Sequence, residues 1–284
     1  MVRRYLAPDA VLPLTCTRSG TCCHGKDISL TPAELARLAR ANGMSASAFR
    51  AAHTSAGGTR LRMSGPPGWR GLAACSQYDA QRGCRVHPAR PLACRLYPLG
   101  RERSGERERF FHEGERFPCL DGCPEVTSLP RLSVADYLRG QEIADLCQVR
   151  DSYLEIAQDL AEGAFVLVFD SGLAESGSGD WRQRWQAVAT GGPEAWIAAL
   201  GSEWHDLITV PDIGSVSEDA WVPAHARLLQ SQAQERLASL TEQSQLAAAS
   251  ATLLAGAVLL LHGVGADSAA VARAWLVKAG EVRG

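Results

Sequence analysis

Cysteine is the residue type whose number and spacing in this sequence point most directly to chemistry. The chain has nine cysteines among 284 residues. Eight fall in the first 123 residues, at Cys16, Cys22, Cys23, Cys75, Cys84, Cys94, Cys119 and Cys123. An odd total argues against a closed set of disulfides, and clustered thiols in a reducing compartment are typical of metal binding. We therefore predict that these eight cysteines ligate a metal.

The donor type narrows the choice of metal. Thiolates are soft ligands that both zinc and iron–sulfur clusters accept, and one zinc ion or one cubane cluster takes four of them. Because three separate segments each supply two or three cysteines, the metal would tie together parts of the chain that lie far apart in sequence. The surplus of thiolates favours a 4Fe-4S iron–sulfur cluster, with zinc as the alternative.

Two cysteines are adjacent, which restricts the geometry of the first segment. Neighbouring side chains of an extended chain point in opposite directions, so Cys22 and Cys23 can share one centre only in a turn. Gly20 and Gly25 would permit such a turn. Otherwise one of the two cysteines serves a second centre or is buried. The ninth cysteine, Cys147, falls in an expected helix and is predicted to be a small buried hydrophobe.

The order of these residues resembles the YkgJ-type CxxCxxCC cysteine-cluster family, described as a zinc- or iron-chelating domain. The matching residues are Cys16, Gly20, Cys22-Cys23, Ile28-Ser29-Leu30-Thr31, Cys75, Cys84, Arg90-Pro91, Cys94-Arg95, Tyr97-Pro98 and Cys123-Pro124. The resemblance covers about residues 10–130. It implies a metal-binding domain whose ligands include these cysteines.

One position departs from the family pattern. The second cysteine of the signature is Ser19 here, and serine is a poor ligand for zinc or an iron–sulfur cluster. Cys119 is an additional cysteine relative to the pattern. We expect it to replace the missing ligand.

Other side chains near the cysteines are candidates for supporting roles. We expect Arg90, Arg95 and Tyr97 to lie at the cofactor, with the arginines donating to carbonyls and offsetting the negative charge of the thiolates. Pairing with surface carboxylates is the alternative for the arginines. His24, His87 and His112 lie near cysteines in sequence and are candidates for ligands or for hydrogen-bond donors to ligands.

The fold class predicted from the sequence is α+β in two domains. Residues 1–130 should form a small, loop-rich, metal-organised domain with short strands and one or two helices. Residues 131–284 should form a mainly α-helical domain. In the first domain the clearest helix begins at Thr31, where Pro32 and Glu34 complete a capping box, and ends at Asn42-Gly43.

The remaining elements are expected as follows. In the first domain we expect a short helix over 45–53, an exposed loop over 54–68, short strands over 72–75 and 85–87, and a solvated charged hairpin over 101–115 turning at Ser104-Gly105. In the second we expect one long helix from Ser133 to about Glu162, an undecided strand or buried helix at 165–169, a linker over 172–180, and helices over 181–190, 194–204, 224–241, 246–261 and 267–278. The apolar stretch 246–264 is long enough for a membrane span, but we expect a buried helix because it is rich in Ala and Gly.

Composition limits the partners and the compartment. The formal net charge is −2, so no basic field predicts binding to nucleic acid or to anionic membranes. The N-terminus lacks the apolar run of a signal peptide, and we expect a cytoplasmic protein. The stretch around Glu203, His205 and Asp206 is expected to be a solvated helix face rather than an acid–base site. Five tryptophans, Trp181, Trp185, Trp196, Trp204 and Trp221, should pack the helical domain.

Three classes of function follow from these patterns. The first is a metalloprotein with an iron–sulfur cluster or zinc, which supports a modification or redox reaction. The second is an S-adenosylmethionine-dependent enzyme acting on a protein or peptide substrate, because the signature is distantly similar to that of flagellin lysine N-methylases. The third is an interaction module in which zinc is purely structural. The enzyme classes considered are thus methyltransferase and redox enzyme, and no catalytic residue can be assigned.

Overall fold

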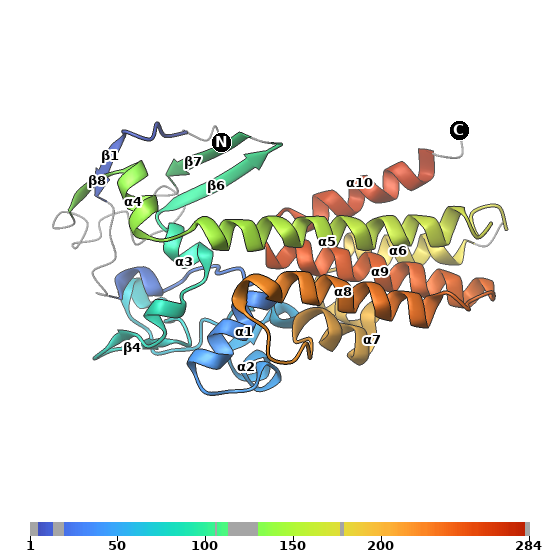
Figure 1. Cartoon of the computed structure of the whole chain (residues 1–284), viewed down its shortest axis with the longest axis horizontal. Helices are drawn as coiled ribbons and strands as arrows, with labels where there is room; N and C mark the ends of the chain where they lie inside the picture. Colours follow the sequence, from blue (N-terminus) through green and yellow to red (C-terminus); the bar gives the residue numbers. More distant parts are fainter. Residues whose placement is uncertain (1–4, 14–19, 106, 113–129, 177–178, 282–284) are drawn as a thin grey trace. The chain divides into compact units, whose positions relative to one another are not determined.

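A computed structural model describes residues 5–13, 20–105, 107–112, 130–176 and 179–281. The fold class is α+β, as predicted, with short strands toward the N-terminus and long helices toward the C-terminus (Figure 1). Contacts group the chain into two compact units. The cysteine unit consists of residues 1–28 and 61–148, and the helical unit consists of residues 29–60 and 149–284.

These units differ from the predicted domains over residues 29–60 and 131–148. Residues 29–60 join the helical unit because they contact its helices directly. The Thr59 hydroxyl lies 2.7 Å from Nδ1 of His262, and Arg60 donates a 2.6 Å hydrogen bond to the His262 carbonyl. Such contacts between distant segments leave no local mark in a sequence.

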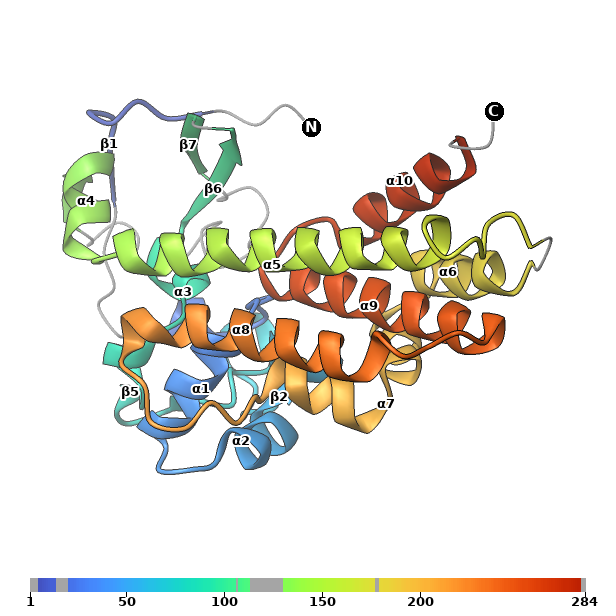
Figure 2. The same cartoon turned by 45° about the vertical axis from the view of Figure 1, so that its right-hand side comes forward.

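The cysteine unit is built from short two-stranded ladders and single helical turns. Its elements are β1 (Val11–Pro13), η1 (Thr21–Cys23), η3 (Trp69–Gly71), β4 (Tyr78–Asp79), β5 (Gly83–Cys84), η4 (His87–Ala89), α3 (Leu92–Leu96), β6 (Leu99–Ser104), β7 (Arg107–His112), β8 (Arg131–Ser133) and α4 (Val134–Gly140). The antiparallel pairs are β1 with β8, β4 with β5 and β6 with β7. Figure 2 shows α3 followed directly by β6 in this unit.

The charged hairpin of this unit is confirmed. Leu99 pairs with His112 and Ser104 with Arg107, which places the turn at Gly105. Cross-strand ion pairs Arg101–Glu108 and Arg109–Glu102, at 2.5 and 2.8 Å, join the two strands. These four charged side chains therefore neutralise one another in pairs across the ladder. The strands predicted over 72–75 and 85–87 are displaced, because the hairpin around the Asp79–Gly83 turn is made by β4 and β5.

The N-terminal part of the helical unit contains α1 (Pro32–Ala41), α2 (Ala46–His53), β2 (Thr54–Ser55), η2 (Ala56–Gly58) and β3 (Arg60–Leu61), whose last residue is assigned to the cysteine unit. The capping box of α1 is confirmed: the Thr31 hydroxyl accepts from the Glu34 N–H, and the Glu34 carboxylate accepts from the Thr31 N–H. Ser45 caps α2 in the same way. The prediction of an exposed loop over 54–68 is wrong, because Thr54, Thr59 and Leu61 are buried.

The helix predicted from Ser133 to about Glu162 is two helices. α4 begins at its Ser133 cap, as predicted, and ends at Gly140. Glu142 adopts a left-handed φ of 51°, which no continuous α-helix accommodates, and α5 (Ala144–Phe169) begins after it. The stretch 165–169, undecided from sequence, is the last turn of α5.

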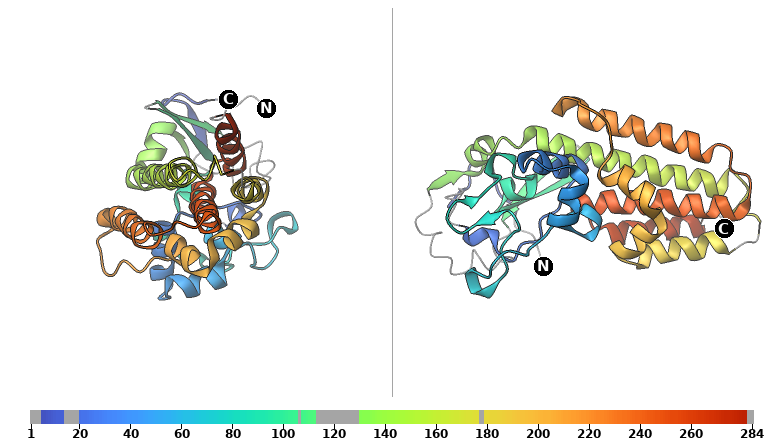
Figure 3. Two further views of the ribbon diagram at one scale, coloured as in Figure 1. Left: turned by 90° about the vertical axis from the view of Figure 1, so that its right-hand side faces the viewer. Right: turned by 90° about the horizontal axis from the view of Figure 1, so that it is seen from below.

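The rest of the helical unit follows the predicted order of helices. These are α6 (Asp180–Thr190), α7 (Pro193–Thr209), α8 (Glu218–Leu237), α9 (Gln243–Gly263) and α10 (Ser268–Glu281). Viewed end-on, α9 lies in the middle of the helical unit with the other helices around it (Figure 3). At Gly256 the absence of a side chain lets α9 approach α7, because a Cβ there would lie 2.5 Å from Cδ1 of Ile208. The five tryptophans pack in this unit as predicted.

α9 is the helix that raised the question of a membrane span. Among the described residues it is the one helix long and apolar enough to cross a bilayer. Its most apolar window is 83% buried inside the structure, so the apolar surface is covered by the other helices. The prediction of a buried helix is confirmed.

Candidate metal centre

The first cysteine segment is a tight turn. Gly20 adopts a left-handed φ of 84° and precedes η1, in which the Cys23 N–H donates a 2.8 Å hydrogen bond to the Gly20 carbonyl. Gly25, with φ 62°, ends the turn. Glycine is required at both positions because residues with a Cβ adopt this region only at a cost. The two glycines therefore provide the turn that would let Cys22 and Cys23 serve one centre.

The surroundings of Gly20 leave no room for a side chain. A Cβ at this position would lie 2.2 Å from Cε2 of Tyr78, so the tyrosine ring covers the turn directly. His24 supports the same turn: its Nδ1 lies 2.9 Å from the Gly20 carbonyl, which can only accept, so Nδ1 is the donor. The His24 and Tyr78 rings meet edge to face at 5.0 Å. His24 thus orients the cysteine turn through the backbone.

The second segment is joined to the first by main-chain hydrogen bonds. The Cys75 N–H donates to the Cys23 carbonyl at 2.8 Å, and the Gly25 N–H donates to the Ala73 carbonyl at 3.0 Å. The Cys75 sulfur accepts from the Gln77 N–H at 3.4 Å. A hydrogen bond to sulfur stabilises a thiolate, and such bonds tune metal centres. Cys75 is therefore held beside the first turn.

Cys84 is presented by the β4–β5 hairpin. Cys84 pairs with Tyr78, and the Asp79 carboxylate closes the turn by accepting from the N–H groups of Gln81 and Arg82 at 2.9 and 2.7 Å. These bonds lower the pKa of Asp79. The hairpin is short, so its turn chemistry rather than strand length fixes the position of Cys84.

Cys94 lies in α3, a helix of five residues that begins after Pro91. Arg95 holds this segment by donating to the carbonyls of Pro88, Arg90 and Gln141 at 2.6, 3.3 and 2.8 Å. Arg90 donates to the His87 carbonyl at 3.1 Å. Both arginines thus make the carbonyl contacts considered from the sequence, and they fix the backbone that presents Cys94. Their contact with a cofactor stays a prediction.

The described cysteines of these segments influence one another's protonation. Burial raises the pKa of the Cys94 thiol well above its usual value, and negative charge on Cys75, Cys84 or Cys22 raises it further, whereas Arg90 lowers it. A hydrogen bond with Cys23 and burial together raise the pKa of Cys22. Burial raises the pKa of Cys75 to about 11. Cys22, Cys75 and Cys84 therefore interact electrostatically with Cys94, and metal binding must displace the protons of these thiols.

Some predicted ligands fall outside the part of the chain that the structure describes. Cys16, Cys119 and Cys123 lie there, as does Ser19. Among the described residues, no three Cys, His, Asp or Glu side chains are already arranged to hold a metal ion. The donor set nevertheless fits a soft metal, because five thiols from two of the three cysteine segments belong to one unit. Cys147 is 8% exposed and packs with Leu92, Leu96, Ile143 and Leu146, as expected for a buried hydrophobe.

Lys26 is a neighbour of the cysteines to which the sequence analysis gave no role. Its ammonium lies 3.5 Å from the centre of the Tyr97 ring, and its charge acts on Cys22. Tyr97, a predicted cofactor-binding residue, is therefore in contact with a cation. The chain has only two lysines, Lys26 and Lys278, and this rarity was the one sign in the sequence that could have drawn attention to Lys26. Nothing in the neighbouring residues indicated that Lys26 is buried.

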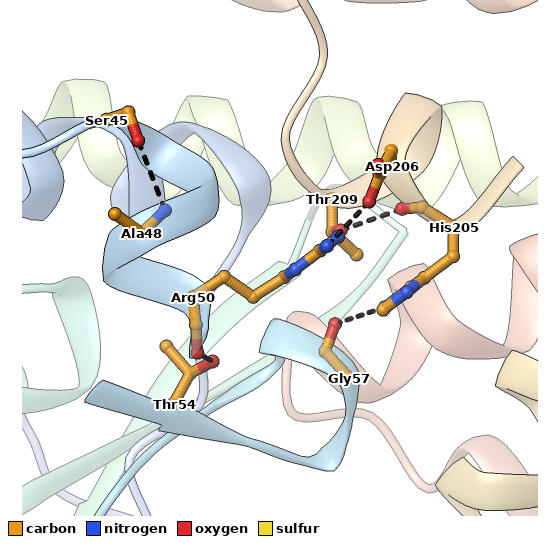
Figure 4. Close-up of polar contacts among 8 residues, drawn as sticks. All are labelled: Ser45, Ala48, Arg50, Thr54, Gly57, His205, Asp206 and Thr209. Carbon is orange, nitrogen blue, oxygen red and sulfur yellow. Dashed lines mark hydrogen bonds and ion pairs between the residues drawn. The ribbon is translucent and has the colours of Figure 1, made fainter. Parts of the chain in front are cut away.

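The helical unit contains a second polar constellation, which lies on α2, η2 and α7 (Figure 4). His205 Nε2 lies 2.9 Å from the Gly57 carbonyl, and burial lowers the pKa of His205. Asp206 accepts from Arg50 at 2.5 Å, while Glu203 pairs with Arg236 at 2.7 Å. Each side chain has its own partner, so this constellation joins helices. The expected solvated face is half-buried at His205 because residues of η2 cover it.

Hydrogen-bonded turns present the free cysteines of the cysteine unit. Residues 15–113 match the model of the CxxCxxCC family, whose description is "Putative zinc- or iron-chelating domain". This match confirms the resemblance and supports metal binding by the segment. It includes six of the eight predicted metal cysteines and ends before Cys119 and Cys123. No curated protein and no solved structure matches the chain. Binding of S-adenosylmethionine and action on a protein substrate stay predictions.

Proposed function

We propose that the cysteine unit binds an iron–sulfur cluster, with zinc as the alternative metal. The observation that carries this proposal is the 2.8 Å main-chain hydrogen bond from Cys75 to Cys23, which joins the first two cysteine segments, together with the electrostatic interaction of Cys94 with Cys22, Cys75 and Cys84. Thiols that raise one another's pKa are unfavourable neighbours as thiolates unless a cation neutralises them. A metal centre supplies that cation, and the family description agrees with zinc or iron.

The number of thiols favours the iron–sulfur cluster. Cys22 and Cys23 share a hydrogen bond, and Cys75, Cys84 and Cys94 lie within electrostatic range of one another or of Cys22. Five thiols exceed the four that one zinc ion takes. A cubane cluster also takes four thiolates, and hydrogen bonds to sulfur, such as the one that Cys75 accepts from the Gln77 N–H, tune such clusters.

The metal content of protein purified without oxygen tests the proposal. We expect iron with acid-labile sulfide and a broad visible absorption that bleaches on reduction. Colourless protein with stoichiometric zinc and no sulfide would select the alternative. Protein that holds neither metal after reconstitution with each would overturn the proposal.

Two cysteine variants make a matched pair for this measurement. Cys94→Ala and Cys147→Ala both remove a thiol from the cysteine unit, and Cys147 is buried among apolar side chains. We expect Cys94→Ala to lose most of its metal and Cys147→Ala to keep it. Equal metal content in the two variants would count against Cys94 as a ligand.

A further inference from the structure

Lys26 is a buried cation beside the first cysteine turn. Only 7% of the surface of Lys26 is exposed. A lysine is rarely this buried unless its charge has a partner, because removing an ammonium from water is costly. The Tyr97 ring is one such partner, since the ammonium lies 3.5 Å from the ring centre.

The partner ring is itself held in place. The Tyr137 hydroxyl lies 2.6 Å from the Tyr97 carbonyl and 2.9 Å from the Arg95 carbonyl. Tyr97 directly follows α3, the helix that carries Cys94. Lys26, three residues after Cys23, therefore links the first cysteine turn to the end of α3, the helix that carries Cys94.

A thiolate centre needs positive charge around it. Four thiolates around Zn²⁺, or around a cubane cluster of charge +2, leave a net charge of −2, and a buried net charge is unfavourable. Two arginines also act on these thiols: Arg90 on Cys94 and Arg85 on Cys75. Arg85 is exposed and Arg90 is half-buried, whereas Lys26 is buried, so water screens the charge of Lys26 least.

We propose that Lys26 is a positioning residue of the metal centre, whose ammonium, held on the Tyr97 ring, is the buried counter-charge of the metal-loaded thiolates. This inference rests on the proposed function. The ligand class is thus a metal–thiolate centre of net negative charge, and Lys26 acts on it by its charge without binding the metal.

Three variants of the full chain separate charge from packing. Lys26→Met removes the charge and keeps a side chain of similar length, and Lys26→Arg keeps the charge. Lys278→Met is the control, because Lys278 also faces an aromatic ring, Phe165 at 6.0 Å, but lies in the helical unit. The readout is the Zn²⁺ affinity of reduced, metal-free protein in competition with a chromophoric chelator, together with its thermal unfolding.

We expect Lys26→Met to weaken Zn²⁺ binding about tenfold or more, as loss of a group that supports metal ligands does. Lys26→Arg should recover most of that loss, and Lys278→Met should bind as the unaltered protein does. Unchanged affinity in Lys26→Met would overturn the inference, and so would an equal loss in Lys26→Arg, since packing would then be the cause. Should Lys26→Met not fold, Lys26→Gln provides the same comparison.

A failure of the proposed function can be distinguished from a failure of the role of Lys26. If the unaltered chain takes up neither zinc nor iron, the metal proposal is wrong, whatever the variants do. If the unaltered chain carries an iron–sulfur cluster, its midpoint potential is a second readout. Lys26→Met should then lower that potential, because the reduced cluster carries one more negative charge and loses more stabilisation. An unchanged midpoint potential would contradict the role of Lys26 but not the binding of the cluster.

Discussion

The backbone N–H of Cys75 donates a 2.8 Å hydrogen bond to the carbonyl of Cys23, which joins two cysteine segments that lie far apart in sequence. An isolated bridge between His24 and Ala74 continues the pairing. These bonds involve the main chain alone, so they do not require a metal. Changes at the turn that orients Cys23 should therefore disturb the site more than changes at side chains that only pack nearby.

Gly20→Ala tests that turn. Gly20 has a left-handed φ of 84°, and a Cβ would lie 2.2 Å from Cε2 of Tyr78. Gly43→Ala is the control, because Gly43 has a similar φ of 63° but no atom within 4 Å of the added Cβ. Both variants carry a backbone penalty of about 1 kcal/mol, and Gly20→Ala should lose about 1–3 kcal/mol more through the clash. Metal content and urea unfolding measure the difference.

A double variant tests whether the clash with Tyr78 causes the loss in Gly20→Ala. Gly20→Ala combined with Tyr78→Ala removes the ring that the new methyl group would meet. We expect the double variant to recover part of the metal content lost by Gly20→Ala. If Gly20→Ala and Gly43→Ala lose equal amounts of metal, the contact with Tyr78 has no role in forming the site.

Cys119 and Ser19 give a second prediction, which rests on sequence alone because both lie outside the described residues. Serine is a poor ligand for soft metals, so Ser19→Ala should leave metal content nearly unchanged. Cys119 lies four residues before Cys123 and can reach the same centre. Cys119→Ala should lower metal content about as much as Cys94→Ala. Full occupancy in Cys119→Ala with loss in Ser19→Ala would refute the replacement.

The parts of the fold that the sequence predicted well depend on local interactions. Thr31, Pro32 and Glu34 lie within one helical turn, so the capping box of α1 could be recognised directly. The break between α4 and α5 could not, because it depends on a left-handed Glu142, and glutamate carries no preference for that conformation. The assignment of residues 29–60 to the helical unit was missed since it depends on contacts with His262, far along the chain.

The candidate site likewise has features that the local sequence predicts and features that depend on distant contacts. The cysteine spacing predicted that Cys22, Cys75, Cys84 and Cys94 share one centre. In the structure the other three act electrostatically on Cys94, and their binding of one metal stays a prediction. The role of Lys26 was not predictable, because its burial depends on the Tyr97 ring, which a distant segment supplies.

Arg50 gives a third prediction, on the stability of the helical unit. Arg50 donates to the Thr209 hydroxyl at 2.7 Å and to Asp206 at 2.5 Å (Figure 4). Its side chain is 19% exposed, so Arg50→Met should cost about 1–2 kcal/mol in the free energy of unfolding. The control is Arg40→Met, whose 3.4 Å pair with Glu218 is well exposed and should contribute less than about 0.5 kcal/mol. Urea unfolding compares the two, and equal losses would contradict the assignment.

His225 is a buried histidine of α8 whose hydrogen bonds fix its protonation. Its Nε2 lies 3.0 Å from the Leu207 carbonyl, which can only accept, so Nε2 carries the proton. Its Nδ1, 3.0 Å from the Tyr153 hydroxyl, therefore accepts from that group in the neutral ring. Burial lowers the pKa of His225 from 6.5 to about 4. Once protonated, Nδ1 could no longer accept from the Tyr153 hydroxyl, and the charge of the ring would be buried away from water.

The lowered pKa of His225 makes the stability of the helical unit depend on pH. Below pH 6.5 the unfolded chain binds a proton that the folded chain takes up only near pH 4, so this contribution is fully present above pH 6.5 and is lost as the pH falls to about 4. The loss amounts to about 3 kcal/mol, since each unit of pKa shift corresponds to about 1.4 kcal/mol. His225→Gln removes the titrating group, so the stability difference between the unaltered chain and this variant should shrink between pH 7 and pH 4.5. Urea unfolding with a metal chelator present measures both. A difference that stays constant over this range would show that His225 titrates normally in the folded protein.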